Sequence, residues 1–434
     1  MNVLFLTMSN QMLKISANGI YTDLARRFYD EGHEVYVMMP FERRSGRKTV
    51  LFKEAGIHIL GVQTLNVEKT NIIEKGLGQV MLEAQFKAAL KKYLGHVRFD
   101  LILYSTPPIT FAKVIEYAKR QNPQAVSYLM LKDIFPQNAV DLGLLKKNGL
   151  KGMLYRSFRK KEKKLYAISD VIGCMSPANV KFILAHNPEI KPEKVEICPN
   201  SCNLVASISL SEEQRVEIRK KYNLPIDCPI FIYGGNLGKP QGIPFLIECL
   251  RANKDRTDCH FLVVGNGTEY NKLEKFVNEE KPQSVSLFRR LPKEDYYYLT
   301  EACDVGLIFL DYRFTIPNYP SRLLSYFRRS GPCKLDAYPI FESNGNPSFL
   351  LATLSTLIRG ISCTSQNLEA TPLQAHPQRN PLHPARLLQN RRQNFVSAAG
   401  LHFFSRKNPK AMKRRVFVTD GAHGIGKGIV EVFA

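Results

Sequence analysis

The chain has 434 residues, 44% hydrophobic and 23% charged, which excludes a disordered or fibrous protein and leaves room for two or three globular domains. Its formal charge of +22 favours an anionic partner, whether a nucleic acid, a phosphate-rich metabolite or an acidic membrane surface. The nine cysteines are scattered without a C-x-x-C pair, which argues against a disulfide framework or a zinc site.

Short β-branched and aromatic runs alternate with helix-length segments from residue 1 to about 200. The first run, in MNVLFLTMSN, lacks the basic start of a signal peptide, and no apolar run approaches the ~18 residues of a membrane span. We therefore expect a cytoplasmic protein. ISANGIYTDLARRFYDEG predicts a helix that ends near Gly32. The alternation predicts a mostly parallel, doubly wound α/β sheet. Strands are expected at Val3–Thr7, Glu34–Met39, Ile57–Val62, Leu101–Ser105, Val126–Leu131, Val171–Met175 and Val195–Cys198.

An aspartate follows one of these strands, in LKDIFPQNAVDLGLL. Because ligands bind at the carboxyl ends of parallel strands, Asp133 is well placed for a cleft and is the candidate catalytic residue. The alternative is a simple helix cap, with Phe135 and Pro136 shaping the turn.

A basic segment comes next, because residues 146–164 carry nine Lys and Arg against the single acid Glu162. Leu150, Leu154 and Phe158 recur every four residues, so one helical face is apolar and the rest cationic. That pattern suits a helix on anionic lipid. Alternatively, the apolar stripe packs on the core of the protein. The residues expected to contact the membrane are Arg159, Lys160, Lys161, Lys163 and Lys164.

The alternation restarts after the turn-rich stretch CPNSCNLVASISLSEEQ, which is interpreted as a linker. Two Rossmann-like halves are therefore expected to face each other across a hinge, over residues 1–200 and 201–326, with ligands in the cleft. Strands are expected at Ile230–Tyr233, His260–Val264, Val285–Phe288 and Val305–Leu310, and helices at Ile243–Ala252 and Tyr270–Asn278.

Two glycine-rich turns follow strands in this half. In YGGNLGKPQG, Gly234 and Gly235 let the backbone approach a ligand and Lys239 adds a cation, so a diphosphate would fit. In FLVVGNGTEYNKLEKF, the turn that starts at Gly265 would line the pocket of a nucleotide base. Plain structural turns are the alternative for both.

A third stretch, IPNYPSRLLSY, predicts a helix that begins at Pro320. Ser321 and Arg322 lie in its first turn, where free backbone N–H groups and the helix dipole favour an anion. The alternative is a surface helix capped by Ser321.

Seven stretches occur in a characteristic order: NGIYTDLARRFYDEGHEVYVM, DIFPQNAVDLGLL, SDVIGCMSPANVKFI, YGGNLGKPQG, VVGNGTE, LPKEDYYYLTEACDVGLIFL and YPSRLLSY. Together they resemble glycosyltransferase family 4, retaining sugar-nucleotide transferases of GT-B architecture, and particularly its bacterial capsule and O-antigen members. The resemblance covers residues 1–326.

The resemblance implies transfer of a hexosyl or N-acetylhexosaminyl group, with retention, from a UDP- or GDP-sugar bound mainly by the second domain. The acceptor would be a polyprenyl-linked glycan at the inner membrane face, bound by the first domain near Asn18 and Gly19. Neither a metal nor a separate cofactor is implied. The donor-binding residues would be Gly234, Gly235, Asn236, Lys239, Gln241, Gly265, Ser321, Arg322 and Ser325.

The chain departs from the family at charged positions. Where the family often has G-R-x(4)-K-G, this chain has Asn236 and Gln241, and Lys239 is the expected substitute. In the family's E-x(7)-E region, the position of the first acid falls near Pro317 and that of the second is occupied by Ser325, so neither acid is present.

The periodicity disappears past Tyr326, and residues 327–434 carry 15 Lys and Arg against 5 Asp and Glu. The family's G-x-P-V strand is missing, so we expect an exposed sheet edge. A frameshift or fusion after about Tyr326 explains an irregular segment at 327–411. The run Arg415–Val418 and the following TDGAHGIGKG resemble the start of a short-chain dehydrogenase, with Asp420 in place of a glycine, so residues 412–434 are interpreted as a fragment of one.

Three other functions compete with the transferase. An NAD(P)-dependent oxidoreductase would need a Y-x-x-x-K pair downstream of the glycine loop, and the match, Tyr128 to Lys132, lies far upstream. A nucleic-acid-binding protein fits the charge but has no recognisable zinc-finger, RNP-like or helix-turn-helix motif. The third is a transferase relic whose donor half no longer works.

Overall fold

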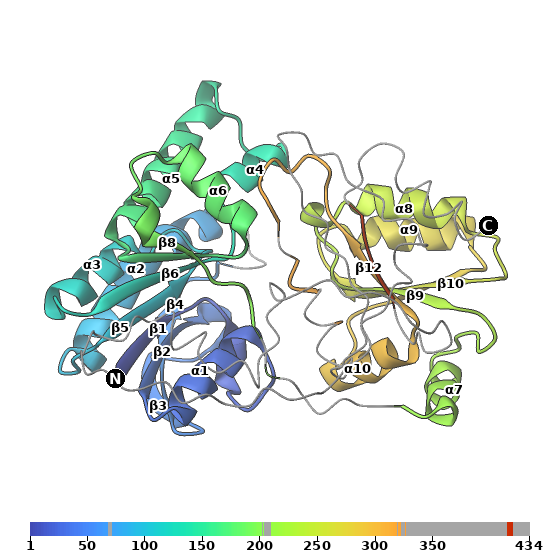
Figure 1. The fold of residues 1–434 in the computed structure, drawn as a ribbon, viewed down its shortest axis with the longest axis horizontal. Helices are drawn as coiled ribbons and strands as arrows, with labels where there is room; N and C mark the ends of the chain where they lie inside the picture. Colours follow the sequence, from blue (N-terminus) through green and yellow to red (C-terminus); the bar gives the residue numbers. More distant parts are fainter. Residues whose placement is uncertain are drawn as a thin grey trace, which may run out of the picture. The chain divides into compact units, whose positions relative to one another are not determined.

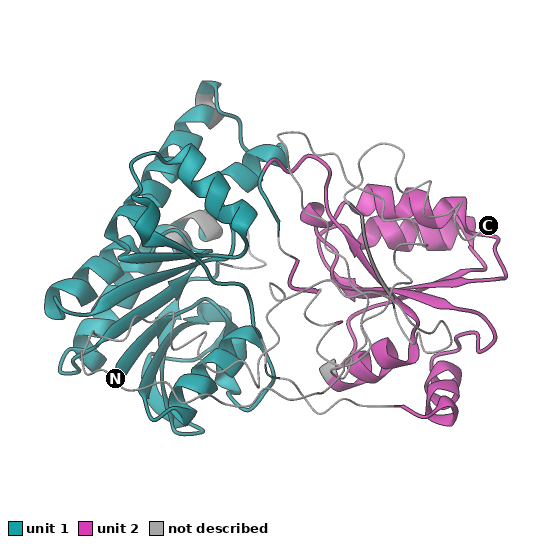
Figure 2. Ribbon diagram, in the orientation of Figure 1, with its two compact units in different colours: residues 1–203, 316–319, 380–399 teal, residues 204–315, 320–379, 400–434 magenta. Residues whose placement is uncertain are grey.

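The computed structural model describes residues 1–67, 72–201, 203, 210–318, 320–322, 326 and 415–419. Figure 2 shows two compact units. Residues 1–203 form the main part of unit 1, and residues 204–315 form that of unit 2. Residues 316–319 belong to unit 1, and Arg322, Tyr326 and residues 415–419 belong to unit 2. The two units are described separately below.

Unit 1 contains an eight-stranded sheet in the order β3-β4-β2-β1-β5-β6-β7-β8. Only the β3–β4 pair is antiparallel. The strands are β1 (Asn2–Leu6), β2 (Glu34–Glu42), β3 (Val50–Glu54), β4 (Ile57–Thr64), β5 (Leu101–Ser105), β6 (Val126–Leu131), β7 (Val171–Cys174) and β8 (Val195–Ile197).

Helices cover both faces of this sheet (Figure 1). Leu24, Ala25 and Phe28 of α1 pack in one core cluster with Val3 and Phe5 of β1. Leu4 and Leu6 alternate with them and are also fully buried, so β1 is apolar from Val3 to Leu6. The helices are α1 (Ile20–Asp30), α2 (Ile72–Leu94), α3 (Ala112–Gln121), α4 (Gln137–Asp141), α5 (Gly149–Ile168) and α6 (Pro177–His186), with 3-10 turns η1 (Asn10–Leu13), η2 (Arg43–Ser45) and η3 (Pro192–Lys194).

Unit 2 contains a five-stranded parallel sheet in the order β11-β10-β9-β12-β13. Figure 1 shows α8 and α9 over one face of it and α7 and α10 on the other. The strands are β9 (Ile230–Asn236), β10 (His260–Asn266), β11 (Val285–Phe288), β12 (Val305–Phe309) and β13 (Arg415–Thr419). The helices are α7 (Glu212–Lys221), α8 (Ile243–Ala252), α9 (Tyr270–Glu280) and α10 (Lys293–Ala302), with the 3-10 turn η4 (Lys239–Gln241).

The strands expected from the sequence are all present, and the helix after residue 19 ends before Gly32, which has φ +79°. Four strands are at least two residues longer than expected. β2 and β4 extend to Glu42 and Thr64, and β9 and β10 continue through their glycines to Asn236 and Asn266. Sequence analysis missed β3, an edge strand. Its hairpin turn to β4 uses Ala55 and Gly56, both with positive φ, where an Asn-Gly pair would have signalled a hairpin.

The edge of β12 is paired, contrary to the expectation of an exposed edge. Arg415–Thr419 runs parallel to Val305–Phe309 along its whole length. The predicted short strand of the dehydrogenase-like fragment is therefore part of the sheet of unit 2. The rest of that fragment and residues 327–411 lie outside the described residues.

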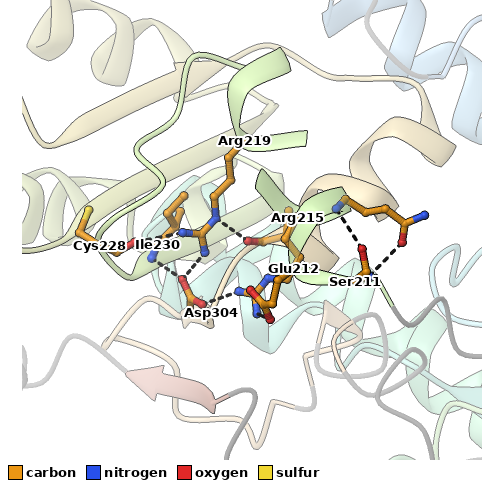
Figure 3. Close-up of polar contacts among 9 residues, drawn as sticks. Ser211, Glu212, Arg215, Arg219, Cys228, Ile230 and Asp304 are labelled. Atoms are coloured by element: carbon orange, nitrogen blue, oxygen red, sulfur yellow. Dashed lines mark hydrogen bonds and ion pairs between the residues drawn. The ribbon is translucent and has the colours of Figure 1, made fainter. Parts of the chain in front are cut away.

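An arginine clamp, formed by Arg215, Arg219 and Asp304, holds α7 to the amino-terminal end of this sheet (Figure 3). Asp304, just before β12, accepts hydrogen bonds from Arg215 Nη2 at 2.6 Å and Arg219 Nη2 at 2.7 Å. The Ile230 N–H of β9 donates to the same carboxylate at 2.7 Å. Arg219 also donates to the carbonyl oxygens of Ala302 and Cys228. One carboxylate thus joins a helix to the starts of two strands.

Candidate functional site: a glycine-lined strand edge with an arginine

The carboxyl ends of β9 and β10 form a surface with little side-chain cover. Gly235 lies opposite Gly265, and a Cβ on Gly265 would overlap the carbonyl oxygen of Gly235. Gly235 itself has φ +118°, a conformation that favours glycine. Gly234 has no room for a side chain, because the hydroxyl of Tyr296 occupies the space. Gly235 is therefore exposed at the edge where parallel sheets bind ligands, whereas Gly234 and Gly265 are buried.

Arg322 lies across this edge. Its guanidinium carbon is 4.2 Å from the centroid of the Tyr233 ring, in cation–π geometry. Its Nε donates to the carbonyl oxygen of Gly234, and Nη1 donates to Gln241 Oε1 at 3.1 Å. Nη2 lies 3.4 Å from the carbonyl oxygen of Asn236. Arg322, which is distant in sequence, thus binds the glycine turn at Gly234, where the turn begins, and at Gln241, near its end.

Two tyrosines, Tyr296 and Tyr326, contact β9 beside this arginine. Tyr326 is buried, and its hydroxyl donates to the carbonyl oxygens of Ile232 at 3.2 Å and Leu307 at 3.0 Å, which join β9 to β12. Burial raises the pKa of both Tyr326 and Tyr296, so both hydroxyls stay protonated at neutral pH. No role was predicted for these tyrosines, because both lie far from the glycine turn in sequence and only the fold brings them beside β9.

The remaining expected donor residues lie around the same turn. Lys239 is exposed in η4, and no ion pair to it is found in the part of the chain that the structure describes. Gln241 accepts from both Arg322 and the Tyr233 hydroxyl, the latter at 3.3 Å. Ser321 is exposed beside Arg322, whereas Ser325 lies outside the described residues. The turn therefore carries one stacked cation and one exposed cation, with an uncharged residue at both 236 and 241.

In unit 1, Asp133 follows β6 at the carboxyl edge of the sheet. Asn138 Nδ2 donates to its Oδ1 at 2.8 Å, and the Thr106 hydroxyl donates to its backbone carbonyl at 3.0 Å. Burial raises the pKa of the Asp133 carboxyl, and the hydrogen bond from Asn138 opposes that shift. The Oδ1 atom of Asn138 is buried without a hydrogen-bond partner. The pair therefore presents a carboxyl group and an unpaired amide oxygen, which suit recognition of a hydroxyl group.

The expected acceptor-side residues lie at the start of α1, at the same edge. The Gly19 N–H donates to Asp23 Oδ1 at 3.1 Å, and Asn18 precedes it. Two residues on, the Tyr21 hydroxyl donates to Ser105 Oγ at the end of β5, 3.1 Å away. Because β1, β5 and β6 are neighbours in the sheet, Gly19 and Asp133 line one edge of unit 1.

Lys132, which sequence analysis considered only for its spacing from Tyr128, precedes Asp133 at this edge. Burial lowers the pKa of its ammonium group, and the thiol of Cys198 at the end of β8 opposes the shift. A lysine at a strand end was visible in the sequence, but its burial depends on packing between separate strands.

The five basic residues of the expected membrane contact are not equally available. Arg159 Nη1 lies 2.6 Å from Glu162, and Lys163 and Lys164 pair with Glu189 and Glu116 at 2.9 and 3.0 Å. Lys160 is exposed and Lys161 is half-buried. The apolar stripe is split as well. Phe158 stacks edge-to-face on Phe135, Leu154 is 47% exposed, and the side chain of Leu150 lies outside the described residues.

A second cavity lies at the opposite end of the sheet of unit 2, beside the arginine clamp. It measures about 360 Å³. Both arginines that line it are ion-paired with Asp304, and it opens at the amino-terminal ends of the strands. Because parallel sheets bind nucleotides at their carboxyl ends, the glycine edge is the better candidate for the donor.

Three features were searched for among the described residues. No group of His, Cys, Asp or Glu there has the geometry of a metal site. The six cysteines described there, Cys174, Cys198, Cys228, Cys249, Cys259 and Cys303, form no disulfide. Within the same residues, no helix is both long and apolar enough to cross a bilayer.

Residues 214–309 match the family profile described as Glycosyl transferases group 1. The chain is also 25% identical over 255 residues to the probable glycosyltransferase WbjE of Pseudomonas aeruginosa, an alignment that covers 56% of this chain and 58% of that protein. The profile thus covers most of the described residues of unit 2, including β9 and the glycine turn.

Solved structures share the fold at low sequence identity. One, from E. coli, is described as trehalose-6-phosphate bound with UDP-2-fluoro glucose and has a TM-score of 0.55 at 9% identity, covering 77% of this chain and 83% of that chain. Another is the N-terminal domain of a Candida albicans trehalose-6-phosphate phosphatase, with a TM-score of 0.50 at 16% identity over 71% and 76% of the two chains. The predicted fold class, an α/β chain of GT-B type, is confirmed.

Proposed function

We propose that the protein is a retaining glycosyltransferase that moves a hexosyl or N-acetylhexosaminyl group from a nucleoside-diphosphate sugar to a lipid-linked glycan in the synthesis of a cell-surface polysaccharide. The proposal goes beyond the profile match in unit 2. The observation that carries it is Arg322, whose guanidinium lies across the glycine edge of β9, between residues 236 and 241.

In this proposal the diphosphate of the donor lies on the backbone of Gly235, within reach of Arg322 and Lys239. Transfer breaks the bond between the anomeric carbon and the diphosphate oxygen, which keeps the electron pair. The acceptor oxygen forms the new bond on the same face of the sugar and passes its proton to the departing diphosphate. Two cations beside the departing diphosphate stabilise the charge that develops there. Arg322 suits this role because Tyr233 and Gln241 hold its planar group in one orientation before the donor arrives.

On the acceptor side we propose that Asp133 and Asn138 bind a hydroxyl group of a reacting sugar. Asn138 orients the Asp133 carboxyl, and its own buried Oδ1 is free to accept a hydrogen bond. Leaving such an atom unpaired costs free energy, so a bound hydroxyl that pairs with it gains affinity. Asn18 and Gly19, at the same edge, are proposed to contact the acceptor.

The first experiment measures nucleotide binding by calorimetry, with UDP and GDP and with the chain and its Arg322→Ala variant. Binding of one nucleotide that the substitution weakens supports the donor site and identifies the base. Binding of neither nucleotide contradicts the proposal.

A transferase relic is the second candidate. Asn236, Gln241 and Ser325 stand where related transferases carry charged groups, which favours it. Binding of a nucleotide without release of UDP or GDP from any nucleotide sugar, with lipid-linked acceptors supplied, would support the relic. Turnover that Asp133→Asn reduces would exclude it.

A further inference from the structure

An apolar and cationic surface lies at the amino-terminal end of α5 and the turn that precedes it. We call it the α5 tip and define it by Leu144, Lys146, Lys147, Met153, Leu154 and Arg156. Figure 1 shows this end of α5 projecting from unit 1, away from the sheet. Leu144 is 48% exposed, Met153 61% and Leu154 47%. In most of unit 1, side chains of this type are buried in the core, so three exposed ones within the eleven residues 144–154 need an explanation.

The charge around these apolar side chains has one sign. Residues 142–161 contain no Asp or Glu, and their basic residues are Lys146, Lys147, Lys151, Arg156, Arg159, Lys160 and Lys161. Within the described part of the chain, Lys146, Lys147 and Arg156 are exposed and have no ion pair. The α5 tip thus combines exposed apolar groups with unpaired cations.

The carboxyl-terminal half of α5 differs. Lys163 and Lys164 are bound to Glu189 and Glu116, and Arg159 is held by Glu162 and by Asn187 Oδ1. These cations attach α5 to its neighbours within unit 1. Arg159, Lys163 and Lys164 are therefore bound within unit 1, whereas Lys160 in α5 and Lys146 and Lys147 in the turn before it are exposed.

We propose that the α5 tip inserts into an anionic lipid bilayer. Leu144, Met153 and Leu154 enter the boundary between headgroups and acyl chains, while Lys146, Lys147 and Arg156 contact lipid phosphates. This combination fits a bilayer better than a nucleic acid, which would leave the three apolar side chains in water. The assignment of the surface stands on exposure and charge alone, whereas its role, delivery of a lipid-linked acceptor to unit 1, rests on the proposed function.

The test is flotation of the full chain with vesicles of phosphatidylglycerol in phosphatidylcholine, compared with phosphatidylcholine alone. We expect binding to the anionic vesicles only. Lys146→Gln with Lys147→Gln weakens partitioning by roughly 20- to 30-fold, since each basic residue at a surface contributes about fivefold. Met153→Ser with Leu154→Ser weakens it at every salt concentration, because the apolar part of the binding does not depend on charge.

The matched control is Lys163→Gln with Lys164→Gln, which removes the same charge from the carboxyl-terminal half of α5 instead of the turn that precedes the helix. Because those lysines are paired within unit 1, this variant is expected to keep most of its binding. An equal loss in the control and in the tip variant overturns the proposal, because diffuse charge would then explain binding. So does equal binding of the Met153→Ser, Leu154→Ser variant, or a preference for duplex DNA over vesicles.

Nucleotide binding, measured in the same preparations, separates the two proposals. A chain that floats with vesicles but binds neither UDP nor GDP supports the proposed role of the α5 tip and contradicts the donor site. A chain that binds UDP or GDP but does not float with vesicles refutes the proposed membrane surface and supports the donor site. Retained nucleotide binding in both tip variants also shows that unit 2 is folded.

Discussion

Replacement of Asp304 by Asn tests whether the arginine clamp holds unit 2 together. The substitution keeps the shape and one acceptor oxygen but removes the charge that Arg215 and Arg219 share. The Arg219 side chain is 7% exposed, so its guanidinium would remain buried beside a neutral group.

The size of the effect follows from the contacts. Breaking a fully buried ion pair costs about 3–5 kcal/mol. Here Arg219 keeps its bonds to two carbonyl oxygens, and Asp304 is 27% exposed, so solvent screens part of the interaction. We expect Asp304→Asn to lower the free energy of unfolding of unit 2 by about 2–3 kcal/mol, the strength of one or two hydrogen bonds to a charged group.

Hydrogen–deuterium exchange read by mass spectrometry measures this locally. Peptides from α7 and from the starts of β9 and β12 should lose protection by roughly 30- to 150-fold, since 1.4 kcal/mol corresponds to tenfold. Peptides from β1 and β5 of unit 1 should not change. The control is Asp258→Asn, which removes an exposed carboxylate paired with Arg256 in the same unit and should leave exchange unchanged. An effect in Asp304→Asn no larger than in this control would refute the reasoning.

Three more predictions concern the site and the sheet edge. Arg322→Lys should weaken UDP or GDP binding about tenfold by calorimetry, because a lysine loses the stacking on Tyr233 and the planar fork; unchanged affinity would contradict the role of Arg322. Burial raises the pKa of Asp133 in the folded protein. Its carboxyl therefore destabilises the fold most at a pH above that raised pKa, where it is ionised, and least at a pH below its pKa in the unfolded chain, where it is protonated. Asp133→Asn should therefore be more stable than the parent at pH 7 by urea unfolding, with the difference shrinking as the pH falls; a constant difference would exclude the titration. A chain cut after residue 411 loses β13 and should aggregate by light scattering, whereas one cut after Thr419 keeps the strand and should not; equal behaviour would show that β13 does not protect β12.

The pairing of β12 with β13 shows how far the sequence interpretation extended. The run at Arg415 was recognisable as a strand from its residues alone, because β propensity is local. Its pairing with β12 was not predictable, because strands can pair however far apart they lie in the sequence. Any parallel strand of suitable length can cover an open edge.

The sequence alone determined the strand–helix alternation, the two Rossmann-like units and the placement of Gly235 and Asp133 at strand ends. These features depend on periodicity and on local turn chemistry, which are set by residues close together in the sequence. The GT-B fold class was implied by the family resemblance of the seven stretches, not by periodicity alone.

Only the tertiary structure decided which charges are available for binding. It placed Arg322 on Tyr233, and it used Lys163 and Lys164 in ion pairs while leaving Lys146 and Lys147 exposed. The physical reason is that a charge is neutralised by whatever lies within a few ångströms of it, and those neighbours come from elements far apart in the chain.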